Sequence, residues 1–149
     1  MNGVRTGHVV LGGLAAGLII NVGESVLNVV LLGDQMNAAL ARMNLPPATG
    51  TRAIATWVVM GFALGLAMTW LYAAIRPRYG AGPATAVRAA LAVYFFSYFY
   101  SGVGLAVMGM FPVRLLAIAL LWGLVELLVA GMAGAWVYTE APLPGEARA

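Results

Sequence analysis

Residues Leu115 to Tyr138 read LLAIALLWGLVELLVAGMAGAWVY, a run of 24 residues whose one charged side chain is Glu126. About 20 apolar residues in a helix are enough to cross the roughly 30 Å hydrocarbon core of a bilayer. This stretch therefore predicts a transmembrane helix.

Three further stretches have the same character. Val9–Leu32 contains one charged residue, Glu24, whereas Ile54–Ile75 and Ala89–Phe111 contain none. Strict alternation of apolar and polar residues is absent, which disfavours a β-barrel, and helices then satisfy the backbone within lipid. We predict an all-α, polytopic membrane protein, a bundle of four transmembrane helices at about 8–32, 54–76, 85–110 and 113–139. They form one domain, 1–140, followed by a polar tail, 141–149, that we expect to be disordered.

The composition supports this class and excludes others. Hydrophobic residues make up 62% of the 149 residues, charged residues make up 9%, and the mean hydropathy is +0.91. A soluble domain carries about 25% charged residues, so a soluble monomer and a disordered chain are both excluded. The chain has no cysteine and one histidine, which argues against thiol chemistry and a metal site. No basic run is present, so we expect no nucleic-acid partner.

Arginines give the expected orientation. The amino terminus, the loop between the second and third helices and the tail carry five: Arg5, Arg76, Arg78, Arg88 and Arg148. The other two connections carry three: Arg42, Arg52 and Arg114. The excess of positive charge predicts that both termini are cytoplasmic.

Prolines and glycines mark the expected helix ends. They are Pro46 and Pro47 before the second helix, Pro77 after it, Gly80, Gly82 and Pro83 before the third, and Pro112 between the third and fourth. In the long first loop, Asp34 is a candidate cap for a short helix over Met36–Met43. We expect that helix to lie on the outer membrane surface.

Small and polar residues are arranged along the predicted helices. Helical spacing places Asn21, Glu24 and Asn28 on one face of the first helix, in line with Gly13 and Gly17. We expect these two glycines, with Gly61 and Gly65 of the second helix, to be helix-packing sites. A polar face of the third helix contains Tyr94, Ser97, Tyr98 and Ser101, and the fourth helix contributes Glu126.

The two glutamates define a candidate polar site within the membrane. Helices one and four run antiparallel in the predicted topology, so Glu24 and Glu126 could approach one another, with the polar face of helix three between them. No lysine or arginine lies within the spans. A buried carboxylate without a cation tends to take up a proton, so we expect at least one glutamate to be neutral. The cluster is either functional or a hydrogen-bonded contact that fixes helix register.

Two resemblances to known families rest on short motifs. Asn21-Val-Gly-Glu24 resembles the Asn-x-x-Glu core of the membrane-associated eicosanoid and glutathione metabolism proteins, which implies four helices, trimers and glutathione. In that family an arginine precedes the motif in the second helix, whereas here Ala15 and Leu18 precede it in the first, and we predict no cofactor. The stretches LYAAIRPRY, from Leu71 to Tyr79, and LWGLVE, from Leu121 to Glu126, are similar to small uncharacterised bacterial four-helix membrane proteins. That resemblance implies a bacterial inner membrane.

Three interpretations are compatible with these features. The first is a non-enzymatic homo-oligomer or subunit of a membrane complex with no catalytic residue, which acts either as an accessory subunit or as a proton- or cation-linked permeation unit. The alternative is a membrane enzyme or binder of a lipid or quinone, with Glu24 or Glu126 as acid or base. A purely structural bundle is a third possibility.

Overall fold

The computed structural model describes residues 4–139, and the regular elements in that range are all helices. Among these residues, four spans are long and apolar enough to cross a membrane: Thr6–Leu31, Thr51–Tyr79, Pro83–Val107 and Val113–Tyr138. The prediction of an all-α bundle with four membrane-spanning helices is therefore confirmed. The tail predicted to be disordered, 141–149, lies outside the described residues.

Two of the spans combine α-helix with π-helix. The elements in chain order are α1 (Thr6–Ser25), η1 (Val26–Leu31), α2 (Gly33–Arg42), α3 (Thr51–Tyr79), α4 (Pro83–Tyr94), η2 (Phe95–Phe99), α5 (Tyr100–Val107) and α6 (Val113–Thr139). In the π-helical segments η1 and η2, each N–H bonds to the carbonyl five residues earlier. At the end of η1, for example, the N–H of Leu32 donates to the carbonyl oxygen of Leu27 over 2.8 Å. Each π segment changes the helical phase of the residues that follow it.

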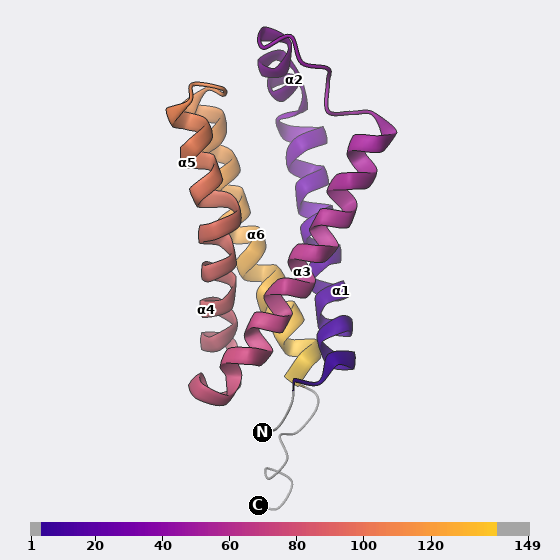
Figure 1. Ribbon diagram of the computed structural model, residues 1–149, viewed down its shortest axis with the longest axis vertical. Coiled ribbons are helices and arrows are strands. Elements are labelled where there is room, and N and C mark those ends of the chain that lie inside the picture. Colours follow the sequence, from indigo (N-terminus) through magenta and orange to yellow (C-terminus); the bar gives the residue numbers. More distant parts are fainter. Residues whose placement is uncertain (1–3, 140–149) are drawn as a thin grey trace, which may run out of the picture.

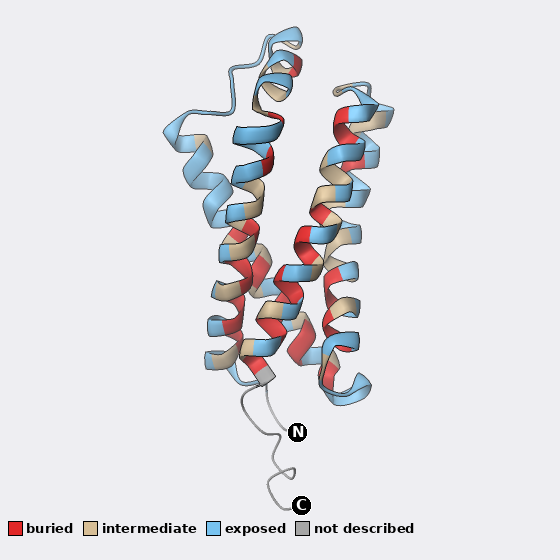
Figure 2. Cartoon of the chain, turned by 180° about the vertical axis from the view of Figure 1, so that it is seen from behind, coloured by how far each residue is buried: buried red, intermediate tan, exposed pale blue. Residues whose placement is uncertain are grey.

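The spans pack side by side, and α3 runs at an angle across α1 (Figure 1). The start of α1, the α3–α4 turn and the end of α6 lie at one end of the bundle, here named the terminal end. α2 and the turn between α5 and α6 lie at the opposite end, here named the far end. Burial is concentrated towards the terminal end, whereas the far half of α3 is largely exposed, with Trp57 66% and Val59 67% exposed (Figure 2).

Glycines allow α1 and α3 to cross at close range. A Cβ on Gly65 would touch the backbone nitrogen of Gly17 and lie 2.5 Å from the carbonyl oxygen of Gly13. A Cβ on Gly13 would lie 2.7 Å from the Cα of Leu66. Because no hydrophobic force drives helices together in lipid, such close backbone contact is a main source of stability.

One of the core clusters lies at the centre of the bundle. It is a cluster of six buried apolar residues from α1, α3, α4 and α6: Ala16, Ile20, Met68, Ala90, Leu127 and Ala130. Three of the six are alanines, so the helices approach closely along this layer. A smaller cluster of Leu27, Leu32 and Leu115 closes the bundle towards the far end.

The second transmembrane helix runs past its predicted end. Pro77 lies inside α3, which ends at Tyr79 and is followed by its C-cap Gly80, where φ is +83°. A proline in the last turn removes only one backbone hydrogen bond, so the helix continues through it. Arg76 and Arg78 in the same turn interact favourably with the negative end of the helix dipole.

Two other boundaries differ from those expected. The third span ends at Val107 rather than near 110, because Gly109 adopts φ +66° and the N–H of Met110 turns back to the carbonyl of Leu105. The interfacial helix begins at Gly33, so Asp34 lies in its first turn and caps nothing. In the first turn, the Asp34 carboxylate still interacts favourably with the positive end of the helix dipole.

The α3–α4 turn supplies a stability prediction. The Tyr72 side chain is 1% exposed, and its hydroxyl accepts a hydrogen bond of 3.2 Å from the N–H of Gly82. Tyr72→Phe leaves that N–H without its partner, and we expect the free energy of unfolding to fall by about 1 kcal/mol. Chemical unfolding in detergent, followed by circular dichroism, measures the change. Tyr79→Phe is the control, because Tyr79 is exposed; equal stability of the two variants would contradict the role of the Tyr72 hydroxyl.

Candidate functional site: a carboxyl pair bridged by tyrosine

The structure brings Glu24 of α1 and Glu126 of α6 to the same tyrosine. The Tyr98 hydroxyl donates to Oε1 of Glu24 over 2.5 Å and lies 3.5 Å from Oε1 of Glu126. Tyr98 belongs to η2, so three spans meet at this point. The bridge connects residues that are 74 and 28 positions apart in the chain.

Each carboxyl group has a second partner. The Asn28 side-chain amide donates to Oε2 of Glu24 over 2.6 Å, and the Trp122 indole N–H donates to Oε2 of Glu126 over 3.1 Å. All four carboxyl oxygens are thus within hydrogen-bond range of a donor. We name Glu24, Asn28, Tyr98, Trp122 and Glu126 the carboxyl cluster.

Two glycines provide the space that the carboxyl cluster occupies. A Cβ on Gly23 would overlap Oε2 of Glu126 and lie 2.7 Å from its carboxyl carbon. A Cβ on Gly123 would lie 2.5 Å from Cδ1 of the Tyr98 ring. Gly23, Gly123 and Trp122 were not among the site residues predicted from the sequence. The available signal was their position, because each stands within one helical turn of a glutamate.

The carboxyl cluster is closed on one flank and open on the other. Glu126 is 6% exposed, Glu24 is half-buried, and Asn28 and its neighbour Ser25 are exposed. The opening therefore lies along the end of α1 and the start of η1, on the side that faces lipid or another protein. Polar groups on a lipid-facing side are costly unless something covers them.

Apolar layers separate the carboxyl cluster from both membrane surfaces. Towards the far end lies the cluster of Leu27, Leu32 and Leu115, against which Trp122 packs. Towards the terminal end lies the core cluster that contains Ile20 and Leu127. No lysine or arginine stands in the sequence between Thr6 and Leu31 or between Leu115 and Tyr138 to balance the charge.

The other predicted polar residues lie outside the carboxyl cluster. Asn21 donates to the carbonyl oxygens of Gly17 and Val58, and it packs against Gly61. Its amide therefore joins α1 to α3 near the glutamates without contacting them.

On the third span, only Tyr98 stands between the glutamates. Tyr94 donates to the carbonyl of Leu120, Ser97 to that of Val93, and Ser101 to that of Ser97. The expectation that all four hydroxyls lie between the glutamates assumed a uniform α-helix. The π-helical η2 changes the phase of this face, and serines in helices readily bond to a carbonyl one turn back.

The kinds of side chain present indicate which chemistry the site can support. Within residues 4–139, no three histidine, cysteine, aspartate or glutamate side chains are grouped so as to hold a metal ion. Two carboxyl groups joined through a hydroxyl form a short hydrogen-bonded chain, which can hold and move protons. Comparison with known protein families, curated proteins and solved structures gives no match for this chain.

Proposed function

We propose that this chain is a proton-linked permeation subunit of a membrane assembly, with the Glu24–Glu126 pair as its proton-binding site. The observation that carries the proposal is the Tyr98 hydroxyl between the two carboxyl groups, 2.5 Å from one and 3.5 Å from the other. A structural contact between helices needs one hydrogen bond. A relay needs a group that can donate and accept at once, and a tyrosine hydroxyl is such a group.

We infer that the pair holds one proton, because a single hydroxyl lies between the two carboxyl groups. Tyr98 has a single O–H, which it donates to Glu24, so its oxygen can accept only from a protonated Glu126. The ionised group is then Glu24, which the Asn28 amide also stabilises and which is the more exposed of the two. When the proton moves from Glu126 through the Tyr98 hydroxyl to Glu24, the negative charge moves from α1 to α6.

The proposed path is completed by another copy or subunit. Within one chain, apolar layers lie on either side of the carboxyl cluster. The exposed Ser25 at the end of α1 and the exposed Asn28 in η1 offer lateral access, and a homo-oligomer would cover them.

We propose a bacterial inner membrane with both termini cytoplasmic. Among the described residues, four arginines, Arg5, Arg76, Arg78 and Arg88, belong to the terminal end, and three, Arg42, Arg52 and Arg114, belong to the far end. The excess at the terminal end supports this orientation.

Proton flux into liposomes tests the proposed function. With a membrane potential applied and a pH-sensitive dye inside, we expect flux above that of protein-free liposomes, rising more steeply than linearly with the protein-to-lipid ratio. Glu24→Gln and Glu126→Gln should each lower the flux roughly tenfold, equivalent to about 1.4 kcal/mol on the transfer barrier.

Asp34→Asn is the matched control, because it makes the same kind of change at an exposed carboxylate of α2. It should leave the flux unchanged. Absence of flux in the folded, inserted protein, or normal flux in both glutamine variants, would refute the proposal.

A further inference from the structure

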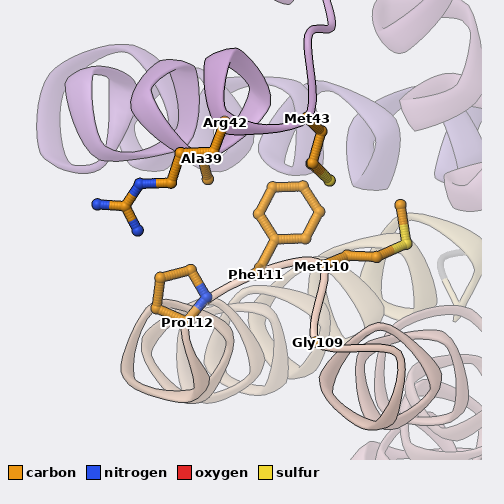
Figure 3. Close-up of a pocket in the computed structure, with 7 residues that line it drawn as sticks. All are labelled: Ala39, Arg42, Met43, Gly109, Met110, Phe111 and Pro112. Carbon is orange, nitrogen blue, oxygen red and sulfur yellow. The ribbon is translucent and has the colours of Figure 1, made fainter.

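A hollow at the far end of the bundle is separate from the carboxyl cluster. Its volume is about 400 Å³, and it lies between α2, which contributes Ala39, Arg42 and Met43, and the turn from Gly109 to Pro112 (Figure 3). A second hollow of about 240 Å³ is lined by Gln35, Arg114 and Leu115 together with Ala39, Arg42 and Pro112. Because the two hollows share three lining residues, they form one groove, here named the far-end groove.

The far-end groove is positively charged. Arg42 lies in the last turn of α2 and Arg114 in the first turn of α6, and both line the second hollow. Neither guanidinium forms an ion pair or a hydrogen bond within residues 4–139. Asp34 is the one acidic residue in the sequence between Glu24 and Glu126, and it lies at the opposite end of α2 from Arg42. Two unpaired like charges beside one groove favour an anion between them.

Helix α6 adds to this field. It begins at Val113, directly after Pro112, so its positive dipole end faces the second hollow. The N–H groups of Leu115 and Leu116 donate to the carbonyl of Pro112, whereas Val113 and Arg114 are the first two residues of α6, whose N–H groups have no carbonyl of the same helix to bond.

The remaining walls of the far-end groove are apolar. Met43 and Phe111 line the larger hollow, with the Phe111 ring lying between α2 and the turn (Figure 3). Phe111 also packs against the buried Leu27, Leu32 and Leu115. A free inorganic anion gains nothing from contact with apolar walls. A lipid places its phosphate beside the arginines and its glycerol and upper acyl chains against the apolar walls.

The depth of the groove agrees with this occupant. The third span ends at Val107 and the fourth begins at Val113, so the groove lies where the membrane-crossing segments end. Lipid phosphates lie at that level of a bilayer.

We propose that the far-end groove binds the phosphate of an anionic phospholipid, held by Arg42 and Arg114. Net negative charge distinguishes this ligand from a zwitterionic lipid, whose cationic group would meet the same arginines. The proposal does not depend on the proton-binding role of the carboxyl cluster.

Native mass spectrometry of the purified chain tests the proposal with phosphatidylglycerol and phosphatidylcholine of matched acyl chains added to the detergent. We expect the wild-type protein to retain phosphatidylglycerol over phosphatidylcholine. Arg42→Gln and Arg114→Gln should each reduce that preference about fivefold, as expected for one basic residue at a lipid surface. Both side chains are exposed, so neither variant should alter the helical content measured by circular dichroism.

Arg52→Gln is the matched control, because Arg52 is an exposed arginine at the same end that does not line the groove. It should keep the preference. Equal retention of the two lipids by the wild-type protein, or an unchanged preference in both groove variants, would overturn the proposal. Displacement of phosphatidylglycerol by excess inorganic phosphate would also overturn it, because the site would then be one for the free anion.

Discussion

Replacing Gly65 with leucine is expected to lower the free energy of unfolding by about 3 kcal/mol or more, the largest effect on stability of any substitution considered for this chain. The new Cβ would meet the backbone nitrogen of Gly17 and the carbonyl oxygen of Gly13, 2.5 Å away. Backbone atoms cannot rotate aside as a side chain does, so α1 and α3 would have to separate along the crossing. A loss of this size changes the ratio of folded to unfolded protein by a factor of roughly 100.

Gly104→Leu is the control for the helix itself. Gly104 lies in α5, and a Cβ there meets nothing within 4 Å. The same substitution should therefore be neutral or slightly stabilising, because glycine is a poor helix former. Unfolding in increasing denaturing detergent, followed by circular dichroism, compares the variants. Equal stability of the two would show that α1 and α3 do not cross at Gly65.

The elements that the sequence predicted best are those with sharp chemical ends. The fourth helix was predicted at about 113–139 and runs from Val113 to Thr139. Pro112 marks its start, and an apolar run sets its length, so two local signals agree. The break after the second helix was less sharp, because Pro77 disrupts little when it falls in a last turn.

The π-helical segments could not have been predicted from these residues. Val26–Leu31 and Phe95–Phe99 have the same apolar character as the α-helical residues around them. A π segment has a less favourable backbone geometry than an α-helix. It persists where the changed helical phase improves packing against neighbouring helices. That information lies in the packing, which one sequence does not state.

The candidate site was predictable only in part, because some of its contacts also depend on how the helices pack. Helical spacing put Glu24 and Asn28 on one face, and topology put Glu126 at a similar depth. The choice of Tyr98 over Ser97 or Ser101 depends on how η2 is rotated, and a serine in a helix has the local alternative of bonding its own backbone. The need for Gly23 depends on how near α6 approaches α1.

A double-mutant cycle of Tyr98→Phe and Glu24→Gln is expected to give a coupling energy of about 2 kcal/mol. The hydroxyl donates to Glu24 over 2.5 Å, in the range of a bond to an ionised group, and such bonds contribute about 1.5–3 kcal/mol. Tyr98→Phe alone removes the hydrogen bond, and Glu24→Gln alone weakens it by removing the charge. The second substitution should therefore cost much less than it does alone.

Tyr94→Phe combined with Glu24→Gln is the matched cycle. Tyr94 stacks on Tyr98, with ring centroids 6.2 Å apart, but its hydroxyl donates to the carbonyl of Leu120 and not to a carboxyl group. The two changes should be additive to within about 0.5 kcal/mol. Unfolding free energies of the wild type, the single variants and the double variants measure both cycles under one set of conditions.

The cycle also bears on the relay between the two glutamates. If Tyr98 joins them, Tyr98→Phe should lower proton flux although both carboxyl groups remain, whereas Tyr100→Phe, which changes a tyrosine that is 72% exposed, should not. A large coupling energy with normal flux in Tyr98→Phe would make the bridge a stabilising contact and leave the two carboxyl groups to act separately. Loss of flux together with the coupling energy requires the hydroxyl itself, because the phenylalanine ring preserves the packing against Gly123.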